Sequence, residues 1–274
     1  MKILQMPEGR EIYFQDKEVV VFNQLARKFP MDRWSQDEFY AWLENEKTII
    51  IDKVPGAKIV EKADARENPP LNTAIYYDTP NREILPTGAL LRTSCNKITH
   101  AFCAFKMAED DRSVRKDHRY VFEGEQKTTI QQGPDSAEAV AVVQRLMRRT
   151  DIEHPGTFLK EAYGIDPTEL SPSIRLDSVR YGFFVWLDKK DALRCSIDRY
   201  DVCDLRVSAD QRKVLPVAEI ELAIYPRISQ QIAEDPRVVE LVESLSDSII
   251  SRFDTNITLD IKYQRSAQAL SISY

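Results

Sequence analysis

The sequence lacks the features of a membrane or secreted protein. It contains no run of about 18 or more apolar residues, the length that a membrane-spanning helix needs. Its first twenty residues do not combine a basic start with an apolar middle, as a signal peptide does. We therefore expect a cytoplasmic protein with no membrane partner. With 43% hydrophobic residues, 30% charged residues and only 8 glycines, the composition is typical of a globular chain rather than a fibrous or disordered one.

Basic residues are not in excess either. The formal net charge is −6 at pH 7. A protein that binds nucleic acid generally needs a basic surface to neutralise the phosphates, so we expect no nucleic-acid partner. The net charge does not exclude a basic cleft within an otherwise acidic surface.

The common short motifs of enzymes and metal sites are absent from the sequence. There is no glycine-rich P-loop, no H-E-x-x-H and no G-x-S-x-G. The four cysteines, Cys95, Cys103, Cys195 and Cys203, form no C-x-x-C and lie in strand-like segments. We interpret them as reduced thiols rather than as a disulfide or a zinc site.

Apolar periodicity predicts an α+β chain with helices and many strands. Residues 31–47 repeat apolar side chains at helical spacing, and Ser35 with Glu38 forms a capping box. The apolar Ile49–Ile51 favours a short strand. A helix is predicted from Asp235-Pro236 to Phe253, with proline in its first turn. The segment after it reads as polar and carries Lys262.

A hairpin organises the middle of the chain. Residues 73–92 read as a strand that ends at Asp78, a turn at Thr79-Pro80-Asn81, and a second strand that opens at Gly88 and presents Arg92. Proline, asparagine and glycine are the residues that tight connections use. Strand-like segments follow it as far as residue 225.

These strands carry charged residues near their centres. The cations are Arg92, Lys106, Arg115, Arg119 and Arg180, and the acids are Asp117, Asp198, Glu219 and Glu221. Charges that face the interior are costly unless they pair or a polyanion and a metal occupy the space between them. Arginine and lysine donate to phosphate oxygens, and carboxylates hold hard divalent cations. The pattern therefore indicates polyphosphate chemistry.

An ordered series of short motifs runs through this region. In chain order they are Ile75-Tyr-Tyr-Asp-Thr-Pro80, Gly88-Ala-Leu-Leu-Arg92, Lys106, Arg115-Lys-Asp117, Pro172-Ser-Ile-Arg175 with Arg180, Arg194-Cys-Ser-Ile-Asp198, Glu219-Ile-Glu221 and Lys262-Tyr263. Together they resemble the CYTH or triphosphate tunnel metalloenzyme superfamily, and the Pro-x-x-Arg-x-x-x-x-Arg spacing is closest to its VTC-like polyphosphate polymerase branch. The family's N-terminal E-x-E-x-K strand is degenerate here, because Glu44-Asn-Glu46-Lys47 has the wrong lysine spacing and lies on a predicted helix.

The resemblance implies a fold and a domain organisation. We expect an antiparallel eight-stranded β-barrel that encloses a charged tunnel, with helices packed outside. Residues 1–274 would form a single tunnel domain. Residues 1–72 would be a strand and helix region that either completes the barrel or decorates it.

The resemblance also implies site residues. The expected catalytic residues are Glu219, Glu221, Lys106 and Arg92. The expected substrate-binding residues are Arg92, Lys106, Arg115, Arg119, Arg175, Arg180 and Lys262. Glu219, Glu221 and Asp198 would hold Mg²⁺ or Mn²⁺.

The function implied is a metal-dependent phosphohydrolase or phosphotransferase that acts on inorganic triphosphate, a nucleoside triphosphate or polyphosphate. One alternative is a catalytically impaired module that binds nucleotide or polyphosphate for sensing or regulation. Another is a structural barrel in which the charges pair with one another. The sequence gives no indication of the oligomeric state.

Overall fold

The computed structural model describes residues 9–13, 19–23, 26–31, 35–61, 66–108, 115–224, 232 and 234–274, and it gives side chains for all of these except 9–13, 19–23, 26, 115 and 116. Its strands are β1 (Gly9–Tyr13), β2 (Val19–Asn23), β3 (Ala26–Met31), β4 (Ala57–Glu61), β5 (Leu71–Asp78), β6 (Leu90–Cys95), β7 (Ala101–Lys106), β8 (Arg115–Val121), β9 (Ser171–Leu187), β10 (Lys190–Asp204) and β11 (Leu215–Ile224). Its helices are α1 (Gln36–Lys53), α2 (Gly124–Gln132), α3 (Ala137–Met147), α4 (Pro155–Tyr163), α6 (Pro236–Phe253) and α7 (Lys262–Ala269), with 3₁₀ turns η1 (Leu85–Thr87) and η2 (Pro167–Glu169). Within these described ranges, no helix has the length and apolar character to cross a membrane.

The strands form one sheet in the order β2-β1-β8-β7-β6-β5-β9-β10-β11-β3, with β4 paired to β9 beside this path. All the pairings are antiparallel except that of β1 with β8. The predicted α+β class and antiparallel sheet are therefore confirmed. The predicted closed barrel of eight strands is wrong, because the described strands number eleven and no described pairing joins β2 to β3.

The N-terminal region contributes to both ends of this sheet. The β1–β2 hairpin adds to β8 at one end, and β3 adds to β11 at the other. These two additions are the physical reason why the strand count exceeds eight and why the path ends in two separate edges.

The sheet has two chemically different faces. Residues paired across antiparallel strands point to the same side, and alternate residues along a strand point to opposite sides. Asp198 in β10 pairs with Arg180 in β9 and with Glu219 in β11, so these three side chains share one face. We call it the charged face. The opposite face, which carries Ile197 and Ile220, is the helix-covered face.

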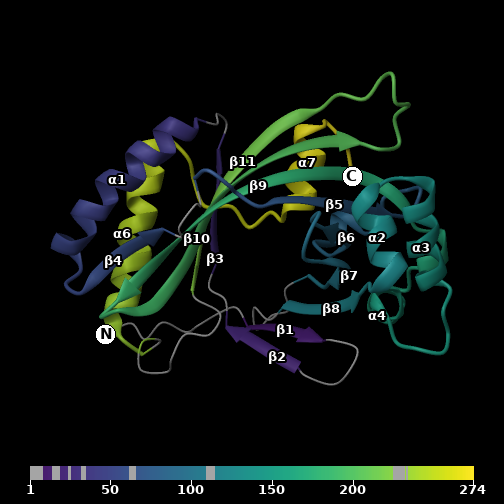
Figure 1. The fold of residues 1–274 in the computed structure, drawn as a ribbon, viewed down its shortest axis with the longest axis horizontal. Helices are drawn as coiled ribbons and strands as arrows, with labels where there is room; N and C mark the ends of the chain where they lie inside the picture. The colour runs from purple at the N-terminus through teal and green to yellow at the C-terminus, as the bar shows by residue number, and fades with distance from the viewer. Residues whose placement is uncertain are drawn as a thin grey trace.

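Two groups of helices cover the helix-covered face at its two ends, as Figure 1 shows. At one end α1 and α6 lie side by side and bury a core against β3, β4 and the paired halves of β9, β10 and β11. At the other end α2, α3 and α4 pack on β5, β6 and β7. Serine N-caps start two of these helices, because the Ser35 side chain accepts from the Glu38 amide and the Ser136 side chain accepts from the Ala139 amide.

Two local predictions are corrected by these helices. Ile49–Ile51 was predicted as a strand but lies within α1, where Ile50 is buried in the core. The polar segment around Lys262 is the short helix α7. It contacts β9 and β11, beside which it is drawn in yellow in Figure 1. Tyr263 and Ala267 pack it on apolar side chains of the charged face such as Tyr76 and Tyr200.

Candidate functional site

Three acids meet on the charged face. Asp198, Glu219 and Glu221 each offer a carboxylate oxygen within 4.8 Å of the others. The first comes from β10 and the other two from β11, where the spacing of two residues keeps both side chains on one face. Asp198 and Glu219 are fully buried. The predicted metal-ligand set is therefore brought together in one cluster, which we call the acid cluster.

Cations from two other elements neutralise the acid cluster. From β9, Arg180 donates through Nε and Nη2 to the two carboxylate oxygens of Asp198, both at 2.6 Å. From α7, Lys262 donates to Asp198, and its Nζ lies 3.1 Å from Glu219 Oε1. Arg265, one turn further along α7, forms an ion pair with Glu219.

Burial and these cations shift the pKa values of the acids in opposite directions. Burial alone would raise the pKa of Asp198, but Lys262 and Arg180 hold that pKa well below its usual range. The same balance lowers the pKa of Glu221, where burial is opposed by Arg180 and Lys262. Both carboxylates are therefore ionised at neutral pH, which is the state that binds cations.

A second charged group lies on the same face, nearer β8. Asp117 is fully buried; Arg119 Nη2 lies 3.0 Å from one of its oxygens and Lys106 Nζ lies 3.6 Å from the same oxygen. The Arg119 guanidinium also lies over the Phe102 ring at 4.8 Å. Arg92 shares this face because it pairs with Ala104, which pairs with Arg119. Within the described part of the chain, no ion pair involves Arg92, and its Nε is buried without a hydrogen-bond partner.

Two predicted site residues are not brought into either group. Arg175 lies on the helix-covered face, where it pairs with Asp177 and Asp135, both at 2.8 Å. It is five residues from Arg180 in an unbroken strand, and an odd spacing places the two side chains on opposite faces. Arg115 lies in β8, and its side chain is outside the described residues.

Sequence reasoning missed several neighbours of the acid cluster. Arg265 lies on a helix that was not predicted. Lys28 pairs across strands with Glu221 and lowers that residue's pKa. The hydroxyls of Tyr76 and Tyr200 are buried and have no hydrogen-bond partner among the described residues. The alternation of polar and apolar side chains within residues 26–31 could have indicated a strand that carries Lys28. Pro30, however, argues against a central strand there, because proline cannot donate a backbone hydrogen bond.

The hydroxyl of Tyr263 explains how α7 is held at this site. It donates to Asp78 Oδ2 at 2.8 Å and lies 3.2 Å from Ser173 Oγ. The ring of Tyr263 also stacks on Tyr76, with centroids 4.6 Å apart and an interplanar angle of 15°. Asp78, predicted as the last residue of a strand, thus anchors the helix that supplies Lys262 and Arg265.

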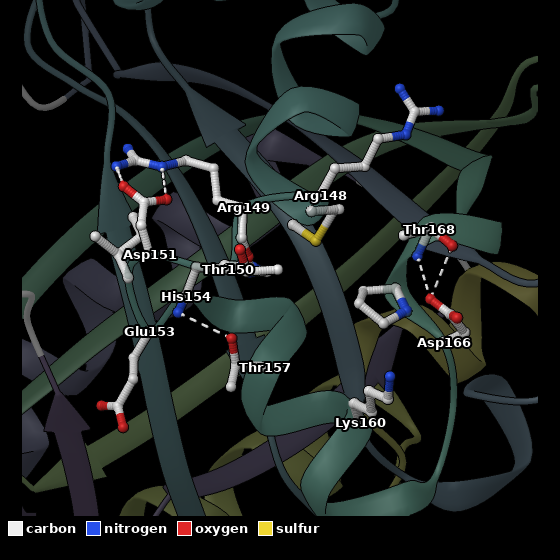
Figure 2. A pocket seen from close by; sticks show the side chains of 13 residues that line it. Arg148, Arg149, Thr150, Asp151, Glu153, His154, Thr157, Lys160, Asp166 and Thr168 are labelled. Carbon is white, nitrogen blue, oxygen red and sulfur yellow. Dashed lines mark hydrogen bonds and ion pairs between the residues drawn. The ribbon is translucent and has the colours of Figure 1, made fainter.

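A hollow of about 490 Å³ lies elsewhere, between the end of α3, the start of α4 and η2 (Figure 2). Arg149 pairs there with Asp151, and the His154 backbone amide donates to Thr157. None of the predicted site residues whose side chains the structure describes lines this hollow. It mixes exposed acids with exposed bases and contains no concentration of one charge.

Neither a protein-family model nor a curated protein matches the sequence. Solved structures do resemble it. A proposed adenylate cyclase from Bacillus halodurans has a TM-score of 0.49 and 12% sequence identity, and the match covers 88% of this chain and 96% of that one. For a proposed adenylyl cyclase from Hippeastrum, described as having a dominant triphosphatase activity, the TM-score is 0.46 with 13% identity, covering 89% of this chain and 96% of that one. For the PH1819 protein from Pyrococcus horikoshii the TM-score is 0.41 with 13% identity, covering 90% of this chain and 98% of that one.

Proposed function

We propose that the charged face binds a linear oligophosphate and that the chain is a CYTH-like phosphohydrolase or phosphotransferase that needs a divalent metal. The observation that carries the proposal is the acid cluster, in which Asp198, Glu219 and Glu221 lie within 4.8 Å of one another beside Arg180 and Lys262. Carboxylates and cations placed together suit a substrate whose own charge is shared between a metal and basic side chains.

The donor chemistry of the acid cluster fits Mg²⁺ or Mn²⁺. Hard cations take oxygen ligands, and all three residues offer carboxylate oxygens on one sheet face. Asp198, Glu219 and Glu221 would hold the ion. A bound divalent cation would supply positive charge next to the phosphate oxygens, which lowers the cost of bringing a nucleophile to the phosphorus.

The basic side chains of the charged face would bind and orient the substrate. Arg180 and Lys262 would donate to oxygens near the acid cluster, and Arg92, Lys106 and Arg119 would do so in the second group. Phosphoryl transfer depends largely on positioning and charge stabilisation, so these cations would act together with Glu219 and Glu221 in catalysis. Arg115 stays a candidate on its sequence position, and Arg175 is left out because its carboxylate partners lie on the other face.

The strand β3 is our candidate for the degenerate E-x-E-x-K motif of a VTC-like chain. It adds to β11, and its Lys28 pairs with Glu221. If Lys28 corresponds to the lysine of the motif, Gln24 and Ala26 stand where the two glutamates would be. The lysine is then retained and two carboxylates are lost.

This loss favours a second candidate function, a module that binds oligophosphate without turnover. Each carboxylate of the acid cluster already has a cation of the chain within 4 Å. A site with fewer acids and a full set of cations suits anion binding more than metal-assisted transfer. Such a module would show oligophosphate-dependent thermal stabilisation, because a ligand that binds only the native state raises its stability.

One set of measurements separates the two candidates. Purified protein is incubated with tripolyphosphate, ATP or long-chain polyphosphate and with Mg²⁺, Mn²⁺ or EDTA, and both phosphate release and melting temperature are recorded. The enzyme proposal predicts metal-dependent release that a Glu219→Ala, Glu221→Ala variant loses. The binding proposal predicts stabilisation without release. If neither appears with any of the three phosphates, both proposals are wrong.

A further inference from the structure

Lys262 occupies the acid cluster as a metal ion would. Its ammonium contacts Asp198 Oδ2 and lies 3.1 Å from Glu219 Oε1, so one cation bridges two of the three carboxylates. The side chain is largely buried, with 17% of its surface exposed. Its ammonium also lies 5.3 Å from the centre of the Tyr200 ring, which adds a favourable cation–π contact.

The fold holds Lys262 in this position. Tyr263, the next residue of α7, is fixed by its stack on Tyr76 and by its hydrogen bond to Asp78. Arg265, three residues after Lys262, ties the same helix to β11 by pairing with Glu219. The backbone of α7 is therefore anchored within its first turn, next to Lys262, and the flexible lysine side chain extends from it to Asp198.

The carboxylates of this region are already neutralised. They form ion pairs with three cations, namely Arg180, Lys262 and Arg265, and Lys28 adds positive charge beside Glu221. Adding a divalent cation without another change would leave at least two positive charges in excess in a largely buried region, and uncompensated buried charge is costly. Arg180 donates two hydrogen bonds to Asp198 through a planar guanidinium, and Arg265 is 6% exposed. Lys262 reaches Asp198 with an ammonium group on a flexible stem, which is the easier group to move.

We propose that Lys262 is a tethered counter-ion that competes with the divalent cation for the acid cluster. Lys262 leaves Asp198 and Glu219 when a divalent cation binds there, and its ammonium then becomes available to donate to a phosphate oxygen. This inference rests on the proposed function, which assigns the acid cluster as the metal site. As a consequence, the unaltered chain should bind a divalent metal only weakly when no phosphate is present, because Lys262 must first be displaced.

The test measures metal binding in the absence of any phosphate. Mn²⁺ is titrated by calorimetry and by electron paramagnetic resonance into the full chain and into a Lys262→Met variant, which keeps side-chain length and loses the charge. We expect Lys262→Met to bind Mn²⁺ about tenfold or more tightly, since a buried ion-pair partner no longer has to be displaced. A Lys262→Arg variant keeps the cation and is expected to stay weak.

Two controls locate the effect. Lys160→Met makes the same chemical change at an exposed lysine of α4 and should leave Mn²⁺ affinity unchanged. A Lys262→Met, Asp198→Asn double variant should lose the gain, which assigns the ion to the acid cluster. Equal or weaker affinity in Lys262→Met, or a gain that survives Asp198→Asn, overturns the proposal.

A second measurement uses the unaltered chain and does not depend on how a variant folds. Acylation of lysines by a small reactive ester is followed by mass spectrometry with and without Mg²⁺. We expect Mg²⁺ to increase the labelling of Lys262 and to leave that of Lys160 unchanged, and an unchanged rate at Lys262 overturns the inference. Phosphate release measured on the same samples keeps the two proposals apart. Absence of turnover with increased labelling contradicts only the enzyme proposal, and turnover with unchanged labelling contradicts only this one.

Discussion

Tyr263 donates its hydroxyl to Asp78 across 185 residues of chain, at 2.8 Å, and so joins the C-terminal helix α7 to the end of β5. Asp78 is completely buried and also accepts from the backbone amides of Thr79, Ile84 and Leu85. Its pKa is raised by burial, against the opposing effect of these hydrogen bonds. The turn after β5 and the position of α7 therefore depend on one carboxylate.

Tyr263→Phe should destabilise the fold, and Tyr200→Phe should not. Removing the Tyr263 hydroxyl takes one donor from a buried carboxylate, a change that costs about 1–3 kcal/mol of unfolding free energy. The Tyr200 hydroxyl is also buried but has no hydrogen-bond partner in the described part of the chain, so its removal should leave stability equal or slightly higher. Urea denaturation of both variants measures this difference. Equal losses in the two variants would contradict the assigned roles.

Glu219→Gln should be far more damaging than loss of an exposed acid. The change leaves the Arg265 guanidinium, which is 6% exposed, without its carboxylate. Breaking a buried pair in this way costs about 3–5 kcal/mol, whereas exposed pairs contribute about 0–1 kcal/mol. Glu44→Gln is the matched control, because Glu44 is half exposed and also pairs with an arginine, Arg66.

A double-mutant cycle completes this prediction. If Glu219 and Arg265 are coupled, the Glu219→Gln, Arg265→Met double variant should recover part of the stability lost in Glu219→Gln. Chemical denaturation of the two single variants and the double variant gives the coupling energy. Additive losses would show that the two side chains act independently and would contradict the ion pair.

Much of the charged face could be predicted because the side chains of a strand alternate between the two faces of the sheet with a fixed period of two residues. Arg92, Lys106, Asp117, Arg119, Arg180, Asp198, Glu219 and Glu221 lie on one face, as their positions near strand centres indicated. The same rule excludes Arg175, which is an odd number of residues from Arg180. The prediction that Arg175 binds substrate is based on the Pro-x-x-Arg motif and does not use this rule.

Other parts of the fold could not be predicted from local sequence patterns. α7 is eight residues long and polar, so its helicity comes from packing against Tyr76 and Asp78 rather than from propensity. Ile49–Ile51 has the composition of a strand, but α1 continues through it because Ile50 enters the core shared with α6. The strand count depended on where β1, β2 and β3 add to the sheet, which is a long-range pairing.

The two arginines of β9 should differ in their effect on ligand binding. Arg180→Met should abolish the tripolyphosphate-dependent rise in melting temperature, and Arg175→Met should retain it, because only Arg180 lies on the charged face. Each variant is compared with its own ligand-free melting temperature, so a change in intrinsic stability does not affect the result. At tripolyphosphate a hundredfold above the dissociation constant, the retained stabilisation is about 2.7 kcal/mol. Loss of the rise in Arg175→Met, or its retention in Arg180→Met, would contradict the assignment.

His154 should make stability fall in mildly acidic solution. It is buried at the start of α4, where its Nδ1 accepts from the Gly156 amide and its Nε2 lies 3.0 Å from the Arg149 carbonyl oxygen. Burial lowers its pKa, the Arg149 carbonyl acts to raise it, and the Arg149 charge lowers it further. The neutral form is therefore favoured in the folded chain, and the unfolded chain takes up a proton first as the pH falls.

The sign of the pH effect follows from this order. The stabilisation is complete above the unfolded pKa of about 6.5 and decreases as the pH falls from there toward the lower folded value. His154→Asn keeps a side chain that caps the helix and removes the titration. Urea denaturation between pH 8 and pH 5 should show a stability loss in the unaltered chain that is smaller in His154→Asn. Identical pH profiles for the two proteins would show that His154 does not carry the effect.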